Sequence, residues 1–363
     1  MGLGETHPSA QVVLAFASPS TLDRRAPLAE LKRMYPIAQI LVCSTAGEIL
    51  DTQVLDERIV ATALSFEHTR VESWSLTPTE ATNSHEAGCL LAQRLHHSDL
   101  SHVLVFTDGI HVNGSSLVRG LVENLDDDVS VSGGLAGDGE RFGETHVFLG
   151  TEPRRELVVG LGFYGSRIRI GQGCLGGWDP FGPERLITRS EANVLHELDG
   201  RSALELYKRY LGDYAQELPA SALLFPLMLR SSGDAPGLVR TVLAIDEERQ
   251  TMTFAGDMPE GQHARLMRAN FERLIDGATG AAKTTLDTGS NAAPDFALLI
   301  SCVGRRMVLK QRVEEEVESV REIFGGNTVM AGFYSYGELS SDGLSGSCEL
   351  HNQTMSITAF SES

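Results

Sequence analysis

The amino-acid sequence predicts an α/β fold with mixed β-sheets, flanking helices and two lobes. Two observations lead to this class. Apolar runs of strand length alternate with helical stretches along nearly all of the 363 residues. Three of these runs also lead into a glycine that is followed by an acidic residue, and glycine after a strand marks a tight turn.

The first of these units lies near the N-terminus. A strand over Val12–Phe16 is followed by a helix over Leu22–Met34 and a second strand over Gln39–Cys43. The chain then turns at Ser44-Thr45-Ala46-Gly47-Glu48, and a further strand covers Arg58–Phe66. The unit therefore has the order strand, helix, strand, glycine-acid turn, strand.

The second unit repeats this order. Its strand His102–Phe106 precedes a helix over Ser115–Asn124 and a strand over Val129–Val131. The turn is Ser132-Gly133-Gly134-Leu135-Ala136-Gly137-Asp138, and the following strand is Glu156–Phe163.

The third unit closes the chain. It comprises a strand over Phe296–Ser301, a helix over Gln311–Phe324, a strand over Thr328–Ala331, the turn Gly332-Phe333-Tyr334-Ser335-Tyr336-Gly337-Glu338 and a strand over Glu349–Phe360. Apolar residues recur in its helix at spacings of four, three and four. Four elements that recur in one order predict a three-fold β-α-β-(Gly-acid)-β repeat. Chance likeness of strand and turn patterns is the alternative.

The segment between units two and three has a different character. Arg185–Arg189 and Asn193–Leu198 predict a hairpin, and Ser202 is expected to cap the helix that follows. Trp178, in a glycine-rich setting, suits a wedge between two lobes. We place the boundary between an N-terminal half, residues 1–185, and a C-terminal half, residues 186–363, just after this tryptophan.

The rest of this segment predicts a second hairpin, a helix and a loop. The hairpin is Leu238–Ile245 with Gln250–Phe254. Asp257 opens the predicted helix, with Pro259 near its first position, and the helix runs to about Ile275. Residues 278–294 are small and polar, which predicts a surface loop.

The charge of the chain excludes two classes of partner. Lys and Arg number 30 and Asp and Glu 49, so the formal net charge is −19. Such a surface repels nucleic acid and anionic membranes. No run of about 18 apolar residues and no signal-peptide pattern occurs, so we expect a cytoplasmic protein.

The cysteines support the same compartment. Their number is odd, their positions are scattered, and no CxxC motif occurs, so neither a disulfide framework nor a structural zinc site is expected. We predict five free thiols: Cys43, Cys89, Cys174, Cys302 and Cys348.

Six groups of residues, in one order along the chain, resemble a known family. They are Ser44–Glu48; Ser132–Asp138; Gly177-Trp178; Asn193-Val194 with Leu198-Asp199-Gly200; Ser301-Cys302-Val303-Gly304-Arg305; and Gly332–Glu338 with Glu349–Thr354. They resemble those of the FIST family, intracellular sensory proteins built from adjoining FIST N and FIST C domains. The two halves then correspond to a FIST N-like and a FIST C-like domain.

The resemblance implies a role in signal transduction. Amino acids are among the ligands proposed for the family, and haem-based sensing of nitric oxide is described in some members. Other members carry a fused output domain, for which this chain has no room. The resemblance therefore implies a ligand sensor that acts on a separate protein, such as a histidine kinase or a cyclic-di-GMP enzyme.

The glycine-acid turns are the candidate ligand site. Ligands of open α/β sheets bind beyond the carboxyl ends of strands, where glycine lets the backbone approach them. An arginine fork and an acid would match the two ends of an amino acid. The candidates are Ser44, Thr45, Gly47, Glu48, Gly133, Gly134, Gly137, Asp138, Arg305, Tyr334, Tyr336, Gly337, Glu338 and Asn352.

Each candidate also has a structural interpretation. The glycines could serve only tight turns, and the acids could bond neighbouring amides. Arg305 could pair internally with Glu338 or Glu48. Tyr334 and Tyr336 project to one side of an extended segment, which could be core rather than cavity.

Two alternatives to a simple ligand sensor remain. A haem sensor needs an axial ligand, and the candidates include His111, His196, His263 and His351, with no CxxCH motif. An enzyme would use Cys302, whose thiol lies near Arg305, but no base is identifiable. Phosphate-loop and calcium-loop motifs are absent. We therefore expect a binding protein rather than an enzyme.

Overall fold

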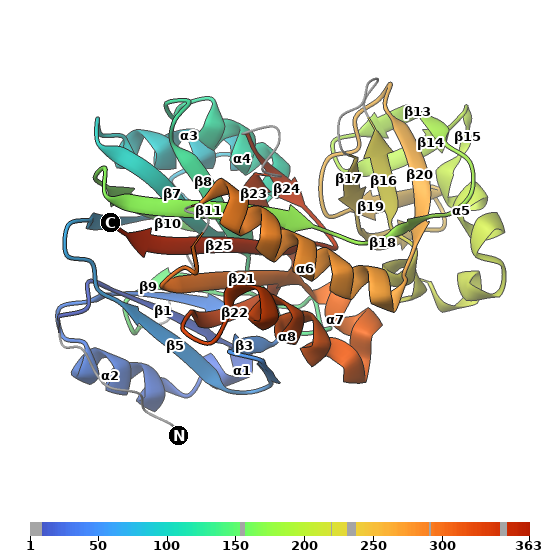
Figure 1. The fold of residues 1–363 in the computed structure, drawn as a ribbon. Coiled ribbons are helices and arrows are strands. Elements are labelled where there is room, and N and C mark those ends of the chain that lie inside the picture. The colour runs from blue at the N-terminus through green and yellow to red at the C-terminus, as the bar shows by residue number, and fades with distance from the viewer. Residues whose placement is uncertain (1–8, 153–156, 219, 231–236, 290–291, 342–346) are drawn as a thin grey trace.

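The computed structural model describes residues 9–152, 157–218, 220–230, 237–289, 292–341 and 347–363. The chain folds into two lobes (Figure 1). The small lobe is one contiguous segment from Asp179 to Arg268, and the large lobe combines the chain before and after it. The predicted α/β class with mixed sheets is confirmed.

Unit one forms a four-stranded sheet whose helices cover one face. The helices are α1 (Pro19–Leu22) and α2 (Arg25–Met34), where one helix was predicted. The strands, in spatial order, are β5 (Ile59–Leu64), β1 (Val12–Ala17), β2 (Gln39–Ser44) and β9 (Val147–Leu149).

Unit two forms a six-stranded sheet with helices α3 (Ser84–Leu95) and α4 (Gly114–Val122). Its strands, in spatial order, are β24 (Cys348–His351), β23 (Gly337–Ser341), β8 (Ser130–Leu135), β7 (Leu100–Thr107), β10 (Val158–Tyr164) and β6 (Arg70–Leu76).

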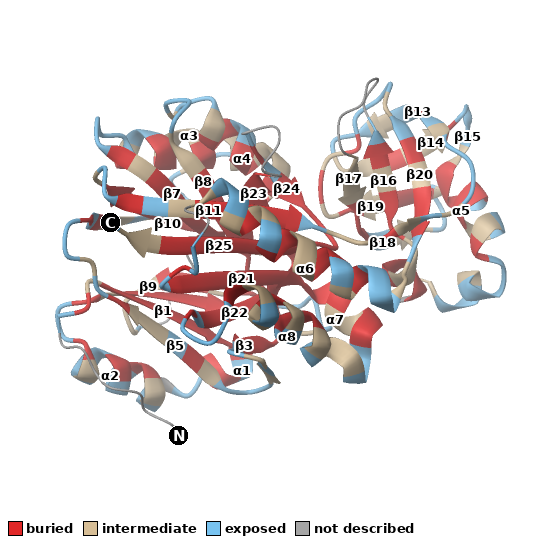
Figure 2. Ribbon diagram, in the orientation of Figure 1, coloured by how far each residue is buried: buried red, intermediate tan, exposed pale blue. Residues whose placement is uncertain are grey.

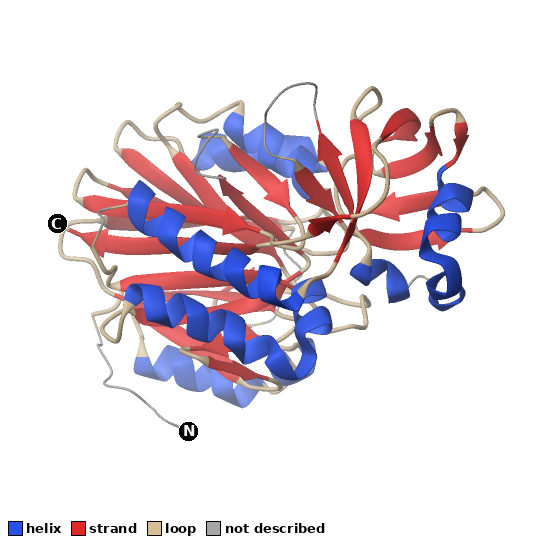
Figure 3. Ribbon diagram, turned by 45° about the vertical axis from the view of Figure 1, so that its right-hand side comes forward, coloured by secondary structure: helices blue, strands red, loops and turns tan. Residues whose placement is uncertain are grey.

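Unit three forms the other six-stranded sheet of this lobe. Helices α6 (Phe271–Thr288) and α8 (Val313–Phe324) lie side by side on it, next to the short α7 (Val303–Leu309) (Figures 1 and 3). The strands, in spatial order, are β11 (Ile168–Leu175), β25 (Met355–Glu362), β21 (Phe296–Cys302), β22 (Val329–Ser335), β3 (Glu48–Leu50) and β4 (Gln53–Leu55).

The same pairing occurs in all three units. The first strand of each (β1, β7, β21) pairs in parallel with the second strand (β2, β8, β22). On its other side it pairs antiparallel with the strand that ends the unit (β5, β10, β25). The predicted repeat itself stays a prediction, but this order of pairing supports it.

The units are joined by strands that cross to a neighbour's sheet. The strand after each glycine-acid turn leaves its own unit: β3 of unit one pairs with β22, β23 of unit three with β8, and β9 of unit two with β2. Phe16, Phe106 and Phe333, one from each unit, meet in the central core with ring centroids 4.8–5.8 Å apart. Figure 2 shows that these central strands are almost wholly buried.

The small lobe is a sheet with one packed helix. The first predicted hairpin is present. In the second, Val242–Asp246 pairs with Thr251–Phe254 as predicted, but Leu238–Arg240 is a separate strand that pairs with Leu227–Arg230. Ser202 caps α5 (Ala203–Leu211) by accepting a hydrogen bond from the Glu205 amide at 3.2 Å. The 3-10 helices η1 (Gly212–Glu217) and η2 (Ala220–Leu224) follow. Its strands are β12 (Asp179–Pro180), β13 (Arg185–Glu191), β14 (Val194–Leu198), β15 (Arg201–Ser202), β16 (Leu227–Arg230), β17 (Leu238–Arg240), β18 (Val242–Asp246), β19 (Thr251–Phe254) and β20 (His263–Arg268).

The predicted helix from Asp257 to Ile275 is wrong. Most of that range is a turn and then strand β20, and a helix begins only at Phe271, capped by Asn270. Strand β20 pairs with β12, β13 and β16, so its backbone groups bond to other strands instead of forming a helix. Proline near a helical start was the misleading signal.

The predicted surface loop at 278–294 is also wrong for most of its length. Helix α6 continues to Thr288, and Ala278, Ala281 and Ala282 are buried in it. A side chain on Gly173 of β11 would lie 2.1 Å from the Ala281 carbonyl. Small residues therefore let the helix and the sheet approach closely. Because this buried face lacks large apolar side chains, the sequence shows no clear helical periodicity here.

Two turns were misplaced. Gly133 and Gly134 lie within strand β8, and Gly332 lies within β22, so the second and third turns begin later than predicted. The last predicted strand, Glu349–Phe360, is divided at residues 352–354 into β24 and β25. All five cysteines are free. Among the described residues, no helix is long and apolar enough to cross a membrane.

Candidate functional site

The three glycine-acid turns meet at one place in the large lobe. The Ala46 amide donates to the Tyr334 carbonyl, and the Tyr334 amide donates to the Gly47 carbonyl, both at 2.8 Å. The Gly137 amide donates to the Ser44 carbonyl, also at 2.8 Å. Backbone hydrogen bonds therefore hold the three turns together.

Ser44 and Gly137 join turns one and two. The Ser44 hydroxyl donates to the Gly137 carbonyl and accepts from the His146 amide, each at 2.8 Å. A Cβ on Gly137 would lie 2.7 Å from the Ala46 nitrogen. Ser44 and Gly137 therefore contact the neighbouring turn rather than a ligand, which favours their structural interpretation.

Gly133 and Gly134 likewise serve packing. Gly133 has a φ of +148°, and a Cβ there would lie 1.8 Å from the Val105 carbonyl on the neighbouring strand. A Cβ on Gly134 would lie 2.9 Å from a methyl group of Ile300. These glycines bring strands and sheets close together, and neither reaches one of the cavities described below.

Glu48 and Glu338 have matching local environments. Each accepts a hydrogen bond at 2.5 Å from the hydroxyl three residues earlier, Thr45 or Ser335. Both are fully buried. Burial raises the pKa of Glu48 to about 7 and that of Glu338 to about 8, because the low-dielectric interior disfavours the charged form. Around neutral pH, a proton is thus held inside the protein at Glu338.

Asn352 lies beside Glu338 at the break between β24 and β25. Its side chain is fully buried, and neither its Nδ2 nor its Oδ1 has a hydrogen-bond partner in the described structure. A Cβ on Gly337 would lie 3.4 Å from Nδ2, so the two residues are in contact. Thr354 donates its hydroxyl to Glu338 at 2.9 Å. Asn352 and Thr354 therefore lie in the break between the two strands, within the range where a single strand was predicted.

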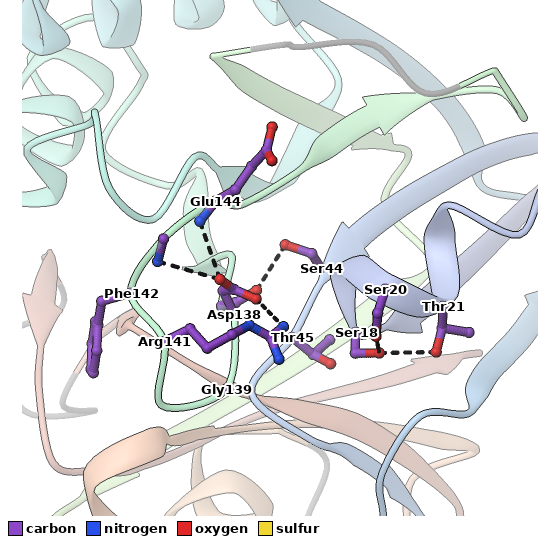
Figure 4. A network of polar contacts seen from close by, with 12 residues as sticks. Ser18, Ser20, Thr21, Ser44, Thr45, Asp138, Gly139, Arg141, Phe142 and Glu144 are labelled. Atoms are coloured by element: carbon purple, nitrogen blue, oxygen red, sulfur yellow. Dashed lines mark hydrogen bonds and ion pairs between the residues drawn. The ribbon is translucent and has the colours of Figure 1, made fainter.

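Asp138 organises the loop that follows unit two. Its carboxylate pairs with Arg141 and accepts from the amides of Gly143 at 3.3 Å and Glu144 at 3.1 Å. Figure 4 shows these groups pointing inward to the carboxylate. The acid is used to shape a loop, as the structural interpretation expected.

Arg305 is buried in the protein interior. Its guanidinium forms an ion pair with Glu316 at 2.7 Å, and both side chains are 0% exposed. It also donates to the carbonyls of Gly176 and Leu274, the latter at 2.7 Å. Tyr334 donates its hydroxyl to the same Glu316 at 2.7 Å. An internal acid holds Arg305, as one interpretation allowed, but that acid is Glu316 rather than Glu338 or Glu48.

The adjacent Arg306 lies on the other side of α7. It donates at 2.6 Å to the Ala46 carbonyl and at 2.6 Å to Asp56. Gly47, with a φ of +129°, leaves room for it, since a Cβ there would lie 2.4 Å from a guanidinium nitrogen. The Arg306 guanidinium also lies 5.6 Å from the Tyr334 ring centre.

Arg306 faces a cavity of about 780 Å³, which we call the α7 pocket. It lies beyond the carboxyl ends of β2, β8 and β21, where ligands of α/β sheets bind. The exposed Lys310 and Glu140 carry opposite charges, and neither has an ion-pair partner among the described residues. The lining residues are Ala46, Asp56, Gly139, Glu140, Val303, Arg306, Met307, Lys310, Gln311 and Val313.

None of the predicted site residues lines the α7 pocket, although Thr45, Gly47, Asp138 and Arg305 each adjoin a residue that does. Sequence reasoning missed Arg306, Lys310 and Glu140. Arg306 and Lys310 are four apart in the sequence, but α7 ends at Leu309 and Lys310 has a φ of +51°, so helical spacing gave no signal for this pair.

Tyr336 reaches a different cavity, between the lobes. It lines this cleft, and its hydroxyl donates to the Gly139 carbonyl at 3.1 Å and accepts from the Phe142 amide at 3.2 Å. Tyr334 and Tyr336 belong to one hydrophobic cluster and Phe333 to another, as their spacing predicted. Trp178 sits where the lobes join, its indole donating to the Gln353 carbonyl at 2.9 Å.

Cys302 is poorly placed for catalysis. Its thiol is 2% exposed, and burial raises its pKa well above the ordinary value. A thiolate is the nucleophilic form, so this environment works against it. Among the described residues, no group of three or more metal-ligating side chains gathers at one place.

Family models match nearly the whole chain. The FIST N domain model matches residues 11–201, and the FIST C domain model matches residues 203–341. The boundary between these matches lies inside the small lobe, whereas the two lobes are divided at the links near residues 178 and 269.

Three relatives are each named as an uncharacterized protein. Proteins of Mycobacterium bovis and Mycobacterium tuberculosis are each 25% identical over 258 residues, which is 66% of this chain and 63% of theirs. A protein of Methanocaldococcus jannaschii is 22% identical over 211 residues, 54% of this chain and 40% of that protein. The chain thus spans about 63% of the length of the mycobacterial relatives.

The solved structures with some likeness to this chain include a hydrolase. A cyanuric acid hydrolase from A. caulinodans aligns over 81% of this chain and 99% of that one, with 11% identity and a TM-score of 0.20. At that score the likeness carries no argument about fold or function.

Proposed function

Because the chain belongs to the FIST family, whose domains are associated with sensing in signal transduction, we propose that it binds a small zwitterionic ligand in the α7 pocket. The ligand class is an amino acid or a close analogue, with a carboxylate and an ammonium group on one small frame. The predicted ligand chemistry is kept, but the arginine at the proposed site is Arg306 instead of Arg305.

The observation that carries this proposal is the pair of unpaired charges in one pocket. Lys310 offers an ammonium to a carboxylate, and Glu140 offers a carboxylate to an ammonium. Two arginines close to this pocket are already paired, Arg306 with Asp56 and Arg312 with Glu315. A charge-assisted hydrogen bond to each end of the ligand is stronger than a neutral one.

Arg306 provides a path from the pocket to the core. Its guanidinium is shared between the Ala46 carbonyl of turn one and the exposed Asp56. A ligand carboxylate would compete with Asp56 for this guanidinium. A ligand that binds one arrangement of Arg306 more tightly shifts the population of turn one, where all three turns meet.

The output is expected in a second protein. We propose a cytoplasmic sensor that acts on a separate signalling protein, such as a histidine kinase or a cyclic-di-GMP enzyme. Binding rather than turnover is the proposed activity, which the burial of Cys302 supports. The enzyme alternative would need iodoacetamide to abolish a measured turnover.

The test is a thermal-shift screen of the twenty amino acids, followed by calorimetry on any that stabilise the protein. Lys310→Gln and Glu140→Gln are expected to weaken binding of the hit at least tenfold. The matched controls Lys283→Gln and Glu318→Gln change exposed residues of the same types on α6 and α8 and should leave affinity unchanged. Equal affinity in all four variants would contradict the assignment of the pocket.

The haem alternative has one supporting observation. His111 lines the cleft between the lobes, and its Nδ1 lies 3.1 Å from both carboxylate oxygens of Asp108. A carboxylate in that place orients an axial histidine and raises its basicity. Haem titration should then produce a Soret band that His111→Ala removes, and absence of the band would dismiss this alternative.

A further inference from the structure

A second cavity lies between the two lobes, distinct from the α7 pocket. Its volume is about 380 Å³, within the usual range for small-molecule sites. The large lobe contributes Asn113 and Tyr336, among others, and the small lobe contributes Asn193 and Leu243. Asn113 also donates to Asp257 of the small lobe at 2.8 Å, so this inter-lobe cleft adjoins a contact that links the lobes.

Exposed apolar side chains concentrate around the inter-lobe cleft. Ile110 is 38% exposed, Phe142 38% and Leu243 41%, and all three line it. They come from three separate segments and from both lobes. Exposed apolar surface gathered at a concave site marks a place where water is displaced by a ligand.

The cleft contains an aromatic platform. The Phe142 and Tyr336 rings stack with centroids 4.5 Å apart and planes inclined by 18°. The backbone of Phe142 has a φ of +50°, which is unfavourable for a large side chain. The loop ordered by Asp138 and the bond from the Phe142 amide to the Tyr336 hydroxyl hold this conformation. Backbone strain that the surrounding contacts maintain indicates that the position of the Phe142 ring has a function.

Asn193, which lines the cleft, carries an amide oxygen that can accept a hydrogen bond. Asn193 donates its Nδ2 to the Phe254 carbonyl at 2.8 Å, which fixes the amide and leaves Oδ1 as an acceptor. In the part of the chain that the structure describes, this oxygen accepts no hydrogen bond. A ligand with an N–H group would satisfy it.

From these four features we propose that the inter-lobe cleft binds a planar aromatic molecule that carries a ring N–H. The ring would stack on the Phe142–Tyr336 platform and contact Ile110 and Leu243, and its N–H would donate to Asn193 Oδ1. Phe142 belongs to the large lobe and Asn193 to the small lobe, so the ligand would favour the arrangement in which both contacts form. This site is independent of the zwitterion proposed for the α7 pocket.

The probe is indole, which has a planar ring and one N–H. Ligand-observed saturation-transfer NMR and a displacement titration with the full chain should detect indole binding. Octahydroindole, which keeps the N–H but is not planar, should bind at least tenfold more weakly. Benzofuran, which keeps the planar ring but lacks the N–H, should also bind more weakly.

Variants then assign the contacts. Phe142→Ala should lower indole affinity at least tenfold, whereas Phe271→Ala, at a 46% exposed phenylalanine outside the cleft, should not change it. Asn193→Ala should abolish the preference for indole over benzofuran. Because Asn193 lies outside the strained loop that contains Phe142, this variant tests the site without changing that loop. Thermal unfolding of each variant checks that the fold is retained.

Three results would overturn the proposal. They are unchanged indole affinity in Phe142→Ala, equal binding of octahydroindole, and no binding of indole at all. A Soret band that depends on His111 and competes with indole would instead assign the cleft to haem. If the protein binds an amino acid but not indole, the proposal for the inter-lobe cleft fails and the one for the α7 pocket stands. If it binds indole but no amino acid, the proposal for the α7 pocket fails.

Discussion

The two sides of helix α7 carry adjacent arginines in opposite environments. On the inner side, Arg305 is 0% exposed and ion-paired with Glu316, which also holds Tyr334. On the outer side, Arg306 is shared between a backbone carbonyl and Asp56, which is 69% exposed, at the wall of a large pocket. The residues are chemically identical and differ by about 100° around the helix.

This difference shows that a motif residue can be important for the fold without contacting a ligand. A buried ion pair is costly to break because the remaining partner stays charged in a low-dielectric interior. An exposed pair is screened by water and contributes little. The inner side should therefore control stability, and the outer side should control binding.

The largest expected effect is on the inner side. Arg305→Met leaves the Glu316 carboxylate buried without its partner, so we expect the free energy of unfolding to fall by about 3–5 kcal/mol. Arg306→Met should cost only about 1 kcal/mol, since water can replace the lost hydrogen bonds. Urea denaturation of both variants measures the comparison, and equal losses would contradict it.

The next effect is the pH dependence of the inner acids. The pKa of Glu338 is about 8 in the folded protein, against an ordinary value of 4.5. Between these values the unfolded chain loses the proton while the folded protein keeps it, so stability falls as pH rises from about 4.5 to 8. In the wild-type protein the free energy of unfolding should therefore fall by a few kcal/mol over this pH range, and Glu338→Gln should remove that fall.

The control for this prediction is Glu318→Gln, which changes an exposed glutamate on α8. It should leave the slope of stability against pH unchanged. A Glu338→Gln variant that keeps the full slope between pH 5 and 8 would show that other groups cause it. Glu48, whose pKa is about 7, is the first such group to test.

A smaller effect is expected where the outer arginine meets turn one. Gly47→Ala must adopt a φ of +129° and displaces the Arg306 guanidinium, so we expect a loss of about 1–3 kcal/mol. Gly139→Ala has a φ of +59° and open space around it, so its loss should be about 1 kcal/mol. Thermal unfolding of both variants measures which one loses more stability. A larger loss in Gly139→Ala would contradict the view that Gly47 makes room for Arg306.

The smallest effect is expected from Asp56→Asn. Its ion pair with Arg306 is exposed, so stability should change by less than about 1 kcal/mol. Removing the competing carboxylate should instead strengthen binding of a carboxylate ligand in the α7 pocket. Calorimetry at two salt concentrations measures this gain, and weaker binding would mean that Asp56 contacts the ligand.

Much of the fold could be predicted because apolar periodicity survives in most elements. The first strands of the three units and the first small-lobe hairpin lie where the pattern placed them. Helix α6 was missed because its core face is built from alanine and glycine, which carry no strong hydrophobic period. Strand β20 was missed because a proline-led turn resembled a helix start.

The environments of the candidate site residues were not predictable from the sequence. The three turns meet, yet Glu48 and Glu338 are enclosed and Asp138 shapes a loop. Sequence spacing indicates which residues share a face of one element. It does not indicate which face another element will cover.

The sequence by itself therefore determined the class of fold, the family and most elements of the three units, because these depend on local patterning and strand direction. Only the tertiary structure decided that Arg305 is internal and that Arg306, Lys310 and Glu140 face a pocket. The physical reason is that exposure and charge pairing depend on neighbours distant in the chain: Glu316 closes over one arginine, while nothing in the described structure closes over Lys310.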